Sequence, residues 1–384
     1  MSQINVRNLS NENEDGAPDI VGISTLSATS YFVPPVGTTA QRPENPQPGD
    51  LRFNTDSASL EYFRGDTLGW SQIEMTSPDL NGGARGVKFG GEDNPAGTGT
   101  NVIQYITIST LGNATDFGDL TVKRGTTGAC ASRTRGLCMS GYWGGYNNHI
   151  DYVTISSTGN ALDFGDLPVA VQGVDVLSSA TRGVITSGSE GTAPGYGISN
   201  VLSYVTIAST GNTQDYGDLS RNTSYGATCA SSTRGIFAGG YNPYNTYANN
   251  IDYITIATTG NSQNFADLTS TFTWCCGLSN STRGIIAGGR GASGGAVLNN
   301  IQYITIATTG DATNFGDLTV ARLLRSSDMA SPTRGVYGGG NATPVKQDVM
   351  DYIQIASTGD AVDFGNLTEA LAAVAGASNA HGGL

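Results

Sequence analysis

Histidine and cysteine are the side chains that most often bind metals or perform acid–base and nucleophilic chemistry, and this chain has few of them. Its 384 residues include two histidines, His149 and His381, and five cysteines, none of them in a Cys-x-x-Cys pair. A structural zinc site needs paired Cys or His ligands, so the sequence predicts no zinc site. Cys130 and Cys229 occupy matching places in repeated segments, and we expect both to be small buried apolar residues.

Carboxylates offer a second route to metal binding. Asp116 and Asp119 form an Asp-x-x-Asp pattern. Calcium takes about six to eight oxygen ligands, and two carboxylates supply few of them. We therefore expect no metal and no cofactor, and without a grouped set of acids, bases or ligands we expect no enzymatic activity.

Arginine recurs at one place in a repeated Arg-Gly turn. Two interpretations are open: the six guanidinium groups bind anionic sugars, or each pairs with an acid such as Asp119, Asp166, Asp218, Asp267 or Asp317 and fixes neighbouring repeats. Recurrence in every repeat favours the structural role. The six residues are Arg85, Arg135, Arg182, Arg234, Arg283 and Arg334.

Two variable loops pair flat aromatic side chains with amides. Aromatic faces stack on sugar rings while Asn side chains bind hydroxyl groups, and the same composition suits protein contacts. The alternative is that these side chains only pack over one face of the fold. The candidate surface-binding residues are Tyr142, Trp143, Tyr146, Asn147, His149, Tyr241, Tyr244 and Tyr247.

The elements that would carry these residues follow from repetition. A short Thr-Arg-Gly mark, altered at both ends of the series, recurs about every fifty residues, a period typical of propeller blades. Between marks the pattern predicts a short apolar strand ended by a double glycine, then a variable loop, an alternating strand, a Gly-Asn or Gly-Asp hairpin turn and two further strands. The marking glycines are Gly86, Gly136, Gly183, Gly235, Gly284, Gly335 and Gly382.

This module resembles the kelch repeat, which implies an all-β, six-bladed kelch-like β-propeller. The resemblance rests on three recurring positions. The second glycine of the pair is Gly91, Gly141, Gly188, Gly240, Gly289 or Gly340. The strand tyrosine is Tyr105, Tyr152, Tyr204, Tyr253, Tyr303 or Tyr352. The kelch tryptophan is replaced by Phe117, Phe164, Tyr216, Phe265, Phe315 or Phe364.

The chain divides into three predicted regions. Residues 1–48 read as a polar arm followed by a stiff Pro-rich linker at 34–48. Residues 49–80 predict a small three-stranded β anchor element. Residues 81–384 form the propeller, and we expect the C-terminal strand to complete the first blade and so close the ring.

The anchor element carries a second resemblance. Residues 49–55, Gly-Asp-Leu-Arg-Phe-Asn-Thr, with Leu60 to Phe63 and Trp70, resemble an element of tail-fibre and other virion proteins of tailed phages. Together with blades reading Asp-Tyr-Ile-Thr-Ile-Ala, the chain resembles structural proteins of phages that infect marine cyanobacteria. This resemblance implies a virion protein, assembled in the host cytoplasm, that contacts other virion proteins through its N-terminal region.

Composition narrows the classes of function that remain possible. The formal net charge of −13 disfavours binding to nucleic acid or anionic lipid. No apolar run reaches the roughly 18 residues needed to span a bilayer, so we expect no membrane insertion. Oligomerisation stays open. We expect a tail-fibre or baseplate-associated adhesin that contacts host surface glycan or protein, with capsid decoration and a cytoplasmic interaction scaffold as alternatives.

Overall fold

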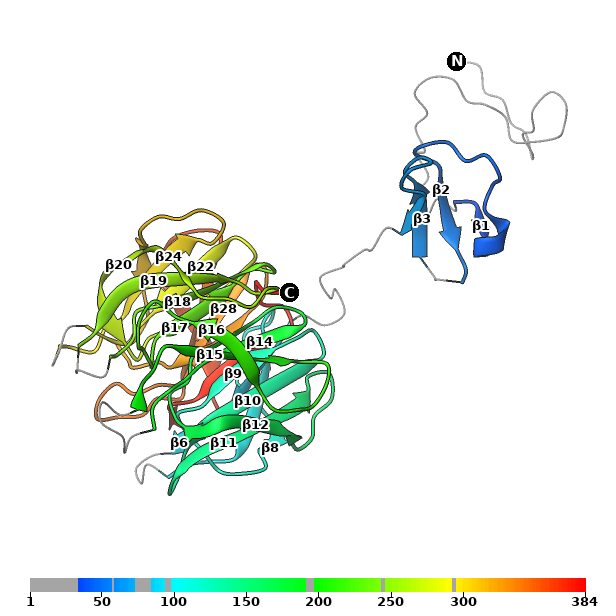
Figure 1. Cartoon of the computed structure of the whole chain (residues 1–384). Helices are drawn as coiled ribbons and strands as arrows, with labels where there is room; N and C mark the ends of the chain where they lie inside the picture. The colour runs from blue at the N-terminus through cyan, green and yellow to red at the C-terminus, as the bar shows by residue number, and fades with distance from the viewer. Residues whose placement is uncertain are drawn as a thin grey trace, which may run out of the picture. The chain divides into compact units, whose positions relative to one another are not determined.

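The computed structural model describes residues 34–56, 59–72, 84–93, 98–190, 197–242, 246–291 and 295–384. Contacts divide the chain into two units, Met1–Ser77 and Pro78–Leu384. Within the described ranges the elements are β-strands and one short 3₁₀ turn, η1 (Thr39–Gln41), so the predicted all-β class is confirmed (Figure 1). Part of the predicted arm (1–33) and Tyr244 lie outside the described residues.

The N-terminal unit is a four-stranded sheet in the order β1-β2-β3-β4. β1 pairs with β2 in parallel, and the other pairs are antiparallel. The prediction of a stiff linker at residues 34–48 is wrong, because this segment supplies β1 and η1 to the sheet. The strands are β1 (Val36–Gly37), β2 (Leu51–Asn54), β3 (Ser59–Phe63) and β4 (Trp70–Gln72).

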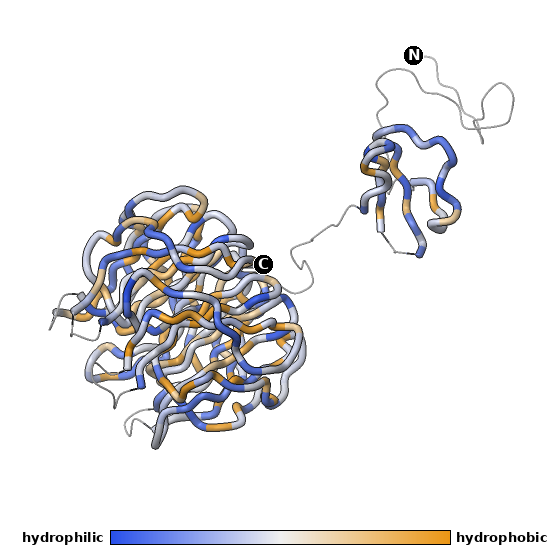
Figure 2. Tube along the Cα trace, in the orientation of Figure 1, coloured by the Kyte–Doolittle hydropathy of each residue, from blue (hydrophilic) through white to orange (hydrophobic). Residues whose placement is uncertain are grey.

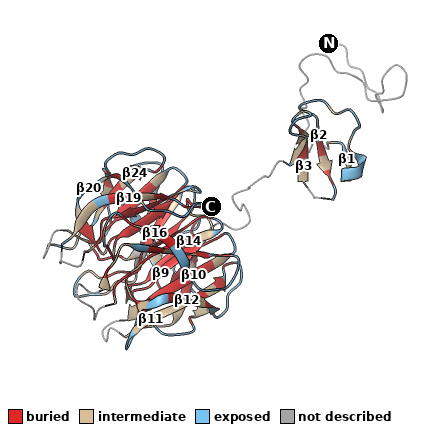
Figure 3. Ribbon diagram, in the orientation of Figure 1, coloured by how far each residue is buried: buried red, intermediate tan, exposed pale blue. Residues whose placement is uncertain are grey.

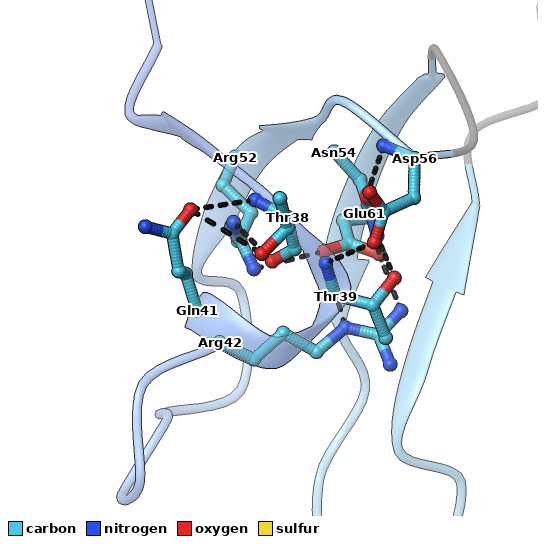
Figure 4. A network of polar contacts seen from close by, with 8 residues as sticks. All are labelled: Thr38, Thr39, Gln41, Arg42, Arg52, Asn54, Asp56 and Glu61. Atoms are coloured by element: carbon cyan, nitrogen blue, oxygen red, sulfur yellow. Dashed lines mark hydrogen bonds and ion pairs between the residues drawn. The ribbon is translucent and has the colours of Figure 1, made fainter.

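A buried carboxylate explains why the Pro-rich segment folds back (Figure 4). Glu61 is fully buried, and its Oε2 lies 2.6 Å from Nη2 of Arg42, which the segment contributes. Nη1 of Arg52 lies 3.3 Å from Oε1, and Asn54 donates a hydrogen bond of 3.1 Å to Oε2. The hydrogen bond from Arg42 holds the pKa of Glu61 below its usual value. A buried carboxylate needs such partners, so Arg42 ties its segment to the sheet.

In its described residues the second unit contains six four-stranded antiparallel repeats (Figure 1). The innermost strand of repeat 1 is the C-terminal β32, which pairs with β5 through Ala375 and Phe89. These small antiparallel sheets are consistent with a β-propeller. Repeat 1 consists of β32 (Ala375–Ser378), β5 (Arg85–Phe89), β7 (Val102–Thr107) and β8 (Thr115–Asp119). Repeat 2 consists of β9 (Gly128–Ala131), β10 (Arg135–Tyr142), β11 (Tyr146–Thr154) and β12 (Leu162–Val171). Repeat 3 consists of β13 (Val176–Ser178), β14 (Arg182–Thr186), β15 (Val201–Thr206) and β16 (Gln214–Asp218).

Repeats 4 to 6 follow the same order, and four very short strands lie between the main ones. Of these, β26 pairs in parallel with β17 and β21 and so joins repeats 4 and 5 into one ten-stranded sheet. Repeat 4 consists of β17 (Ala227–Ala230), β18 (Arg234–Ala238), β19 (Ala248–Thr255) and β20 (Gln263–Thr273), and repeat 5 of β21 (Cys276–Ser279), β22 (Arg283–Ala287), β24 (Asn300–Thr305) and β25 (Thr313–Asp317). Repeat 6 consists of β27 (Met329–Ala330), β28 (Arg334–Gly338), β29 (Val349–Gln354) and β30 (Val362–Asn366). The four short strands are β6 (Glu92–Asp93), β23 (Arg290–Gly291), β26 (Ser326–Ser327) and β31 (Leu371–Ala372).

The hydrophobic core lies between neighbouring repeats. One cluster, for example, joins Phe89 and Phe117 of repeat 1 to Cys138 and Ile155 of repeat 2. Equivalent clusters join each later pair, and the last joins Phe364 of repeat 6 to repeat 1. The apolar and buried segments accordingly follow the strands, whereas the polar and exposed ones follow the turns (Figures 2 and 3). Each repeat therefore buries its two faces against its two neighbours.

The Gly-Asn or Gly-Asp turn fastens each repeat to the one before it. At five junctions the glycine N–H donates to the carbonyl of the preceding repeat's recurring aromatic residue at 2.7–2.9 Å. At all six, the Asn or Asp side chain accepts the N–H of the residue two beyond that aromatic at 3.0–3.1 Å. The turn was predicted only as a hairpin; its residues also hold the junction. They are Gly112-Asn113, Gly159-Asn160, Gly211-Asn212, Gly260-Asn261, Gly310-Asp311 and Gly359-Asp360.

The six recurring arginines contact main chain rather than carboxylates. In each, Nη1 donates to an isoleucine carbonyl of the next repeat at 2.8–3.1 Å, and the guanidinium lies 4.3–4.7 Å from the centre of its own repeat's tyrosine ring. Arg334 of repeat 6 donates to Ile108 of repeat 1, which completes the cycle. The predicted pairing with Asp119 and its equivalents is wrong: among the described residues, the ion pairs do not include these arginines. The planar guanidinium group stacks on the tyrosine ring and donates to a carbonyl beyond it, so each arginine is held without an acidic partner.

The glycine after each arginine makes room for the previous repeat's innermost strand. At five of six positions an added Cβ would lie 2.3–2.9 Å from a side chain on that strand. Two of those side chains are Cys130 and Cys229, both buried as expected. Burial raises the pKa of each thiol to about 12, so both remain protonated and serve as small apolar residues.

The innermost strands of repeats 1 to 5, with Ser327 and Asp328 of repeat 6, surround a narrow central space of about 40 Å³. His381, half-buried and lining this space, donates from Nε2 to the carbonyl of Ala131 at 2.8 Å, because Nδ1 accepts the N–H of Gly383 at 3.1 Å. Burial lowers the pKa of His381, which favours this neutral form. Gly382 donates to the carbonyl of Ser279 at 2.9 Å. The C-terminal residues thus bind across strands of repeats 2 and 5.

Candidate functional site

The first predicted loop is the tip of a β-hairpin. Strands β10 and β11 extend beyond Ser140-Gly141, which stands in repeat 2 where most other repeats have a double glycine, and pair Tyr142 with Tyr146. Their rings lie 5.2 Å apart, and Tyr142 and Trp143 are 40% and 44% exposed. Trp143 packs over Gly99 of repeat 1, where an added Cβ would lie 2.9 Å from it. The hairpin therefore presents three aromatic side chains on a framework of paired strands.

Asn147 and His149 complete the predicted residues of this hairpin. The side chain of Asn147 accepts the main-chain N–H of His149 at 2.9 Å, which turns it toward its own strand. Nδ1 of His149 lies 3.4 Å from Asp166, and both side chains are 44% exposed. These two residues hold the base of the hairpin and add less to its exposed tip.

The second predicted loop, in repeat 4, is tied down in the same manner. Tyr241 and Tyr247 form a β-bridge, and their rings lie 6.0 Å apart. Tyr241 also bridges Ser224, in the segment that leads to the innermost strand of repeat 4. The described ends of this loop thus add two half-buried tyrosines to the candidate surface.

An aromatic–arginine cluster, absent from the sequence-based prediction, lies beside these tyrosines. It consists of Tyr225, Trp274, Arg290 and Arg325. The two rings meet edge to face at 6.3 Å. Arg325 lies 5.1 Å from the centre of Tyr225 and 5.8 Å from that of Trp274, and Arg290 lies 5.0 Å from Trp274. Burial raises the pKa of Tyr225. The hairpin reaches this cluster, because Tyr142 bridges Gly125 and the next residue, Thr126, lines one small cavity with Tyr225 and Arg325.

Three members of the cluster occupy one equivalent position in successive repeats. Tyr225, Trp274 and Arg325 stand at the same place before the Arg-Gly mark in repeats 4, 5 and 6, whereas the other copies carry Thr126, Gly173 and Ala373. Main-chain hydrogen bonds of 2.8–3.3 Å link most of these six positions in turn. The large side chains therefore gather on one half of the ring of positions, and small ones on the other.

The cluster carries positive charge in an acidic protein. In the part of the chain that the structure describes, neither Arg290 nor Arg325 forms an ion pair. Nε of Arg290 and Nε1 of Trp274 are buried without a hydrogen-bond partner, and so is Oδ1 of Asp175 below the ring of positions. Burial raises the pKa of Asp175 to about 7. Guanidinium groups without an ion-pair partner beside aromatic rings are an arrangement that recognises a polar ligand with apolar faces.

Divergence between repeats was the signal that could have found this cluster. Trp274 and Arg325 differ in size and charge from their small equivalents, but they lie in the segment where the copies align least well. Within the described ranges, no group of three or more His, Cys, Asp or Glu residues is placed to hold a metal ion. Nor does any helix in those ranges have the length and apolar character to cross a bilayer.

The protein-family models and the curated proteins offer no match to this chain. The function therefore has to be argued from the geometry of the site.

Proposed function

We propose that the six four-stranded repeats are the blades of a six-bladed kelch-like β-propeller. The closed cycle of contacts supports this proposal, because each repeat binds the next and Arg334 of repeat 6 binds repeat 1. β32 and β5, from opposite ends of the unit, form one sheet, as closure of a ring requires.

We infer that the protein is a non-enzymatic virion structural protein of a tailed phage, and that its propeller is a tail-fibre or baseplate-associated adhesin. The N-terminal unit, with its resemblance to virion proteins, would contact other virion components. The propeller would face the host. The observation that carries adhesion is the proximity of the aromatic–arginine cluster to the tyrosines of the repeat 2 hairpin.

Host surface glycan is the ligand that this surface suits best. Rings such as Trp143 and Trp274 offer flat faces to the apolar face of a sugar. Arg290 and Arg325 offer several N–H donors to hydroxyl or carboxylate groups without an ion-pair partner of their own. A surface of anchored aromatics and adaptable donors is typical of recognition rather than of catalysis.

A glycan screen with matched variants tests this assignment. The labelled full chain is applied to host-envelope polysaccharides, and Trp274→Ala and Trp143→Ala are compared with it. Loss of a central aromatic anchor is expected to cost about 2 kcal/mol or more, a roughly thirtyfold weaker affinity. Leu111→Ala, which trims an exposed side chain in a turn outside the site, should bind as the wild type does.

The melting temperatures of all variants are measured in parallel. Glycan binding that survives both tryptophan substitutions in folded protein would contradict the site. A wild-type chain that binds no envelope polysaccharide would contradict glycan recognition itself.

A further inference from the structure

One buried lysine touches one buried aspartate where the last repeat meets the first. Nζ of Lys88 lies 2.8 Å from Oδ2 of Asp328, and the two side chains are 3% and 1% exposed. Lys88 belongs to β5 of repeat 1, and Asp328 lies between β26 and β27 of repeat 6. The contact therefore joins the two ends of the repeat series.

Both residues break the repeat pattern at positions that otherwise carry uncharged side chains. The equivalents of Lys88 are Cys138, Ile185, Phe237, Ile286 and Tyr337. The equivalents of Asp328 are Ala129, Val176, Thr228, Gly277 and Gly376. Gly376 pairs with Lys88 and leaves the space for both side chains, because a Cβ there would lie 2.7 Å from Oδ1 of Asp328.

The choice of lysine is informative because, among the residues of this unit that the structure describes, the other fully buried ion pairs use arginine. Arg124 pairs with Asp151 at 3.0 Å, and Arg322 pairs with Asp351 at 3.1 Å. A guanidinium stays charged and satisfies a buried carboxylate with several donors. A lysine amine can lose its proton in a dry site and then act as a nucleophile.

We propose that Lys88 and Asp328 condense to form an isopeptide bond that covalently joins repeat 1 to repeat 6. The reaction replaces two buried charges by one neutral amide, and it thereby removes the desolvation cost of the ion pair. The fold holds the amine against the carboxyl group, which supplies the high effective concentration that an intramolecular condensation needs.

The surroundings of Asp328 favour attack at its carboxyl carbon. Oδ1 accepts the N–H of Met329 at 3.0 Å, and Oδ2 accepts the N–H of Gly338 at 3.1 Å. Both donors polarise the carboxyl group, and the N–H of Met329 stabilises the negative charge that develops on Oδ1 in the tetrahedral intermediate. The thiol of Cys276 lies 3.8 Å from Oδ2. Burial keeps the pKa of this thiol well above its usual value, so it remains a donor.

The atoms balance without a co-reactant. The ammonium group of Lys88 first passes one proton to Oδ2 of Asp328, and burial favours this step because it raises the pKa of the carboxyl group. The amine nitrogen then attacks Cγ, and a second proton passes to Oδ2. The Cγ–Oδ2 bond breaks and water leaves, so that nitrogen keeps one hydrogen in the amide.

Space for the leaving water exists beside the pair. Asp328 lines the central space of about 40 Å³. A water molecule needs roughly 10–15 Å³ of such a space, so the water released by the reaction fits there.

Mass spectrometry of the purified full chain tests the bond directly. The denatured wild-type protein is expected to be lighter than its sequence by one water molecule. Trypsin should release a branched peptide in which residues 86–123 are joined to residues 326–334 through Lys88 and Asp328. Lys88→Arg keeps the positive charge but removes the nucleophilic amine, so its mass should equal that of its sequence.

Lys123→Arg is the matched control, since Lys123 is exposed and should leave the water loss unchanged. The proposal is overturned if folded wild-type protein has its full sequence mass, or if the water loss persists in Lys88→Arg. Should Lys88→Arg fail to fold, the wild-type mass and the branched peptide decide alone.

Discussion

Replacing Gly165 by alanine should loosen the junction between repeats 2 and 3. Gly165 follows the recurring aromatic Phe164 and has a φ of +150°, a region that is almost confined to glycine. An added Cβ would lie 2.4 Å from the carbonyl oxygen of Gly211. That contact would separate the strand from the turn that holds it.

The cost can be summed from the junction. The backbone strain costs about 1–3 kcal/mol. The hydrogen bond placed at risk runs from Gly211 to Phe164 at 2.7 Å, because its equivalent is the bond missing, within the described ranges, at the junction of repeat 4. It contributes about 1 kcal/mol, so the free energy of unfolding should fall by about 2–4 kcal/mol.

Repeat 4 shows that the junction responds to such a side chain. It carries Ala266 in place of the glycine, and at this junction, among the described residues, Gly310 does not donate to the aromatic carbonyl. The bond from Ala312 to Asp267 at 2.9 Å remains there.

Urea unfolding followed by far-ultraviolet circular dichroism measures the effect. Gly211→Ala is the control that separates backbone strain from steric clash. Gly211 has a φ of +154°, so alanine is strained there too, but no atom lies within 4 Å of an added Cβ. Gly165→Ala should therefore be the less stable of the two variants. If it is as stable as Gly211→Ala, the close packing of the junction does not matter and the reasoning is wrong.

Two further predictions concern titration and ring closure. Because burial raises the pKa of Asp175 to about 7, the native state holds a proton that the unfolded chain releases above about pH 4. Stability should therefore fall as pH rises from about 4 to 7, by up to about 4 kcal/mol, and Asp175→Asn should lack this slope in urea titrations at several pH values. Parallel curves for the two proteins would exclude a buried, titrating Asp175. Removing residues 370–384 deletes β32 and exposes the edge of β5, so the truncated chain should unfold or aggregate in light-scattering and melting experiments. A truncated chain that melts like the full one would refute closure by this strand.

The periodic part of the fold could be predicted from the sequence because its causes are local and repeated. The Arg-Gly mark, the glycine that follows the first apolar strand and the strand tyrosine recur in each copy. In repeat 5 the Arg-Gly mark begins β22, Gly288-Gly289 follow its end and Tyr303 lies within β24. The all-β class followed from this pattern. The partner of each recurring arginine did not, since a carbonyl such as that of Ile207 carries no signature in the sequence.

Residues that occur only once were harder to place. The fold-back of the Pro-rich segment depends on buried Glu61, which reads in the sequence as an ordinary exposed strand residue. Tyr225, Trp274 and Arg325 come together only through the circular arrangement of the repeats. Of the predicted surface residues, Tyr142 and Trp143 are exposed on the hairpin.

Location on the particle tests the proposed function most directly. An antibody against the propeller, detected with gold on intact virions of the phage that encodes this chain, would show where the protein lies. The adhesin account predicts label on the tail, its fibres or the baseplate. Label spread over the head would instead indicate capsid decoration, and unlabelled virions would contradict a virion role altogether.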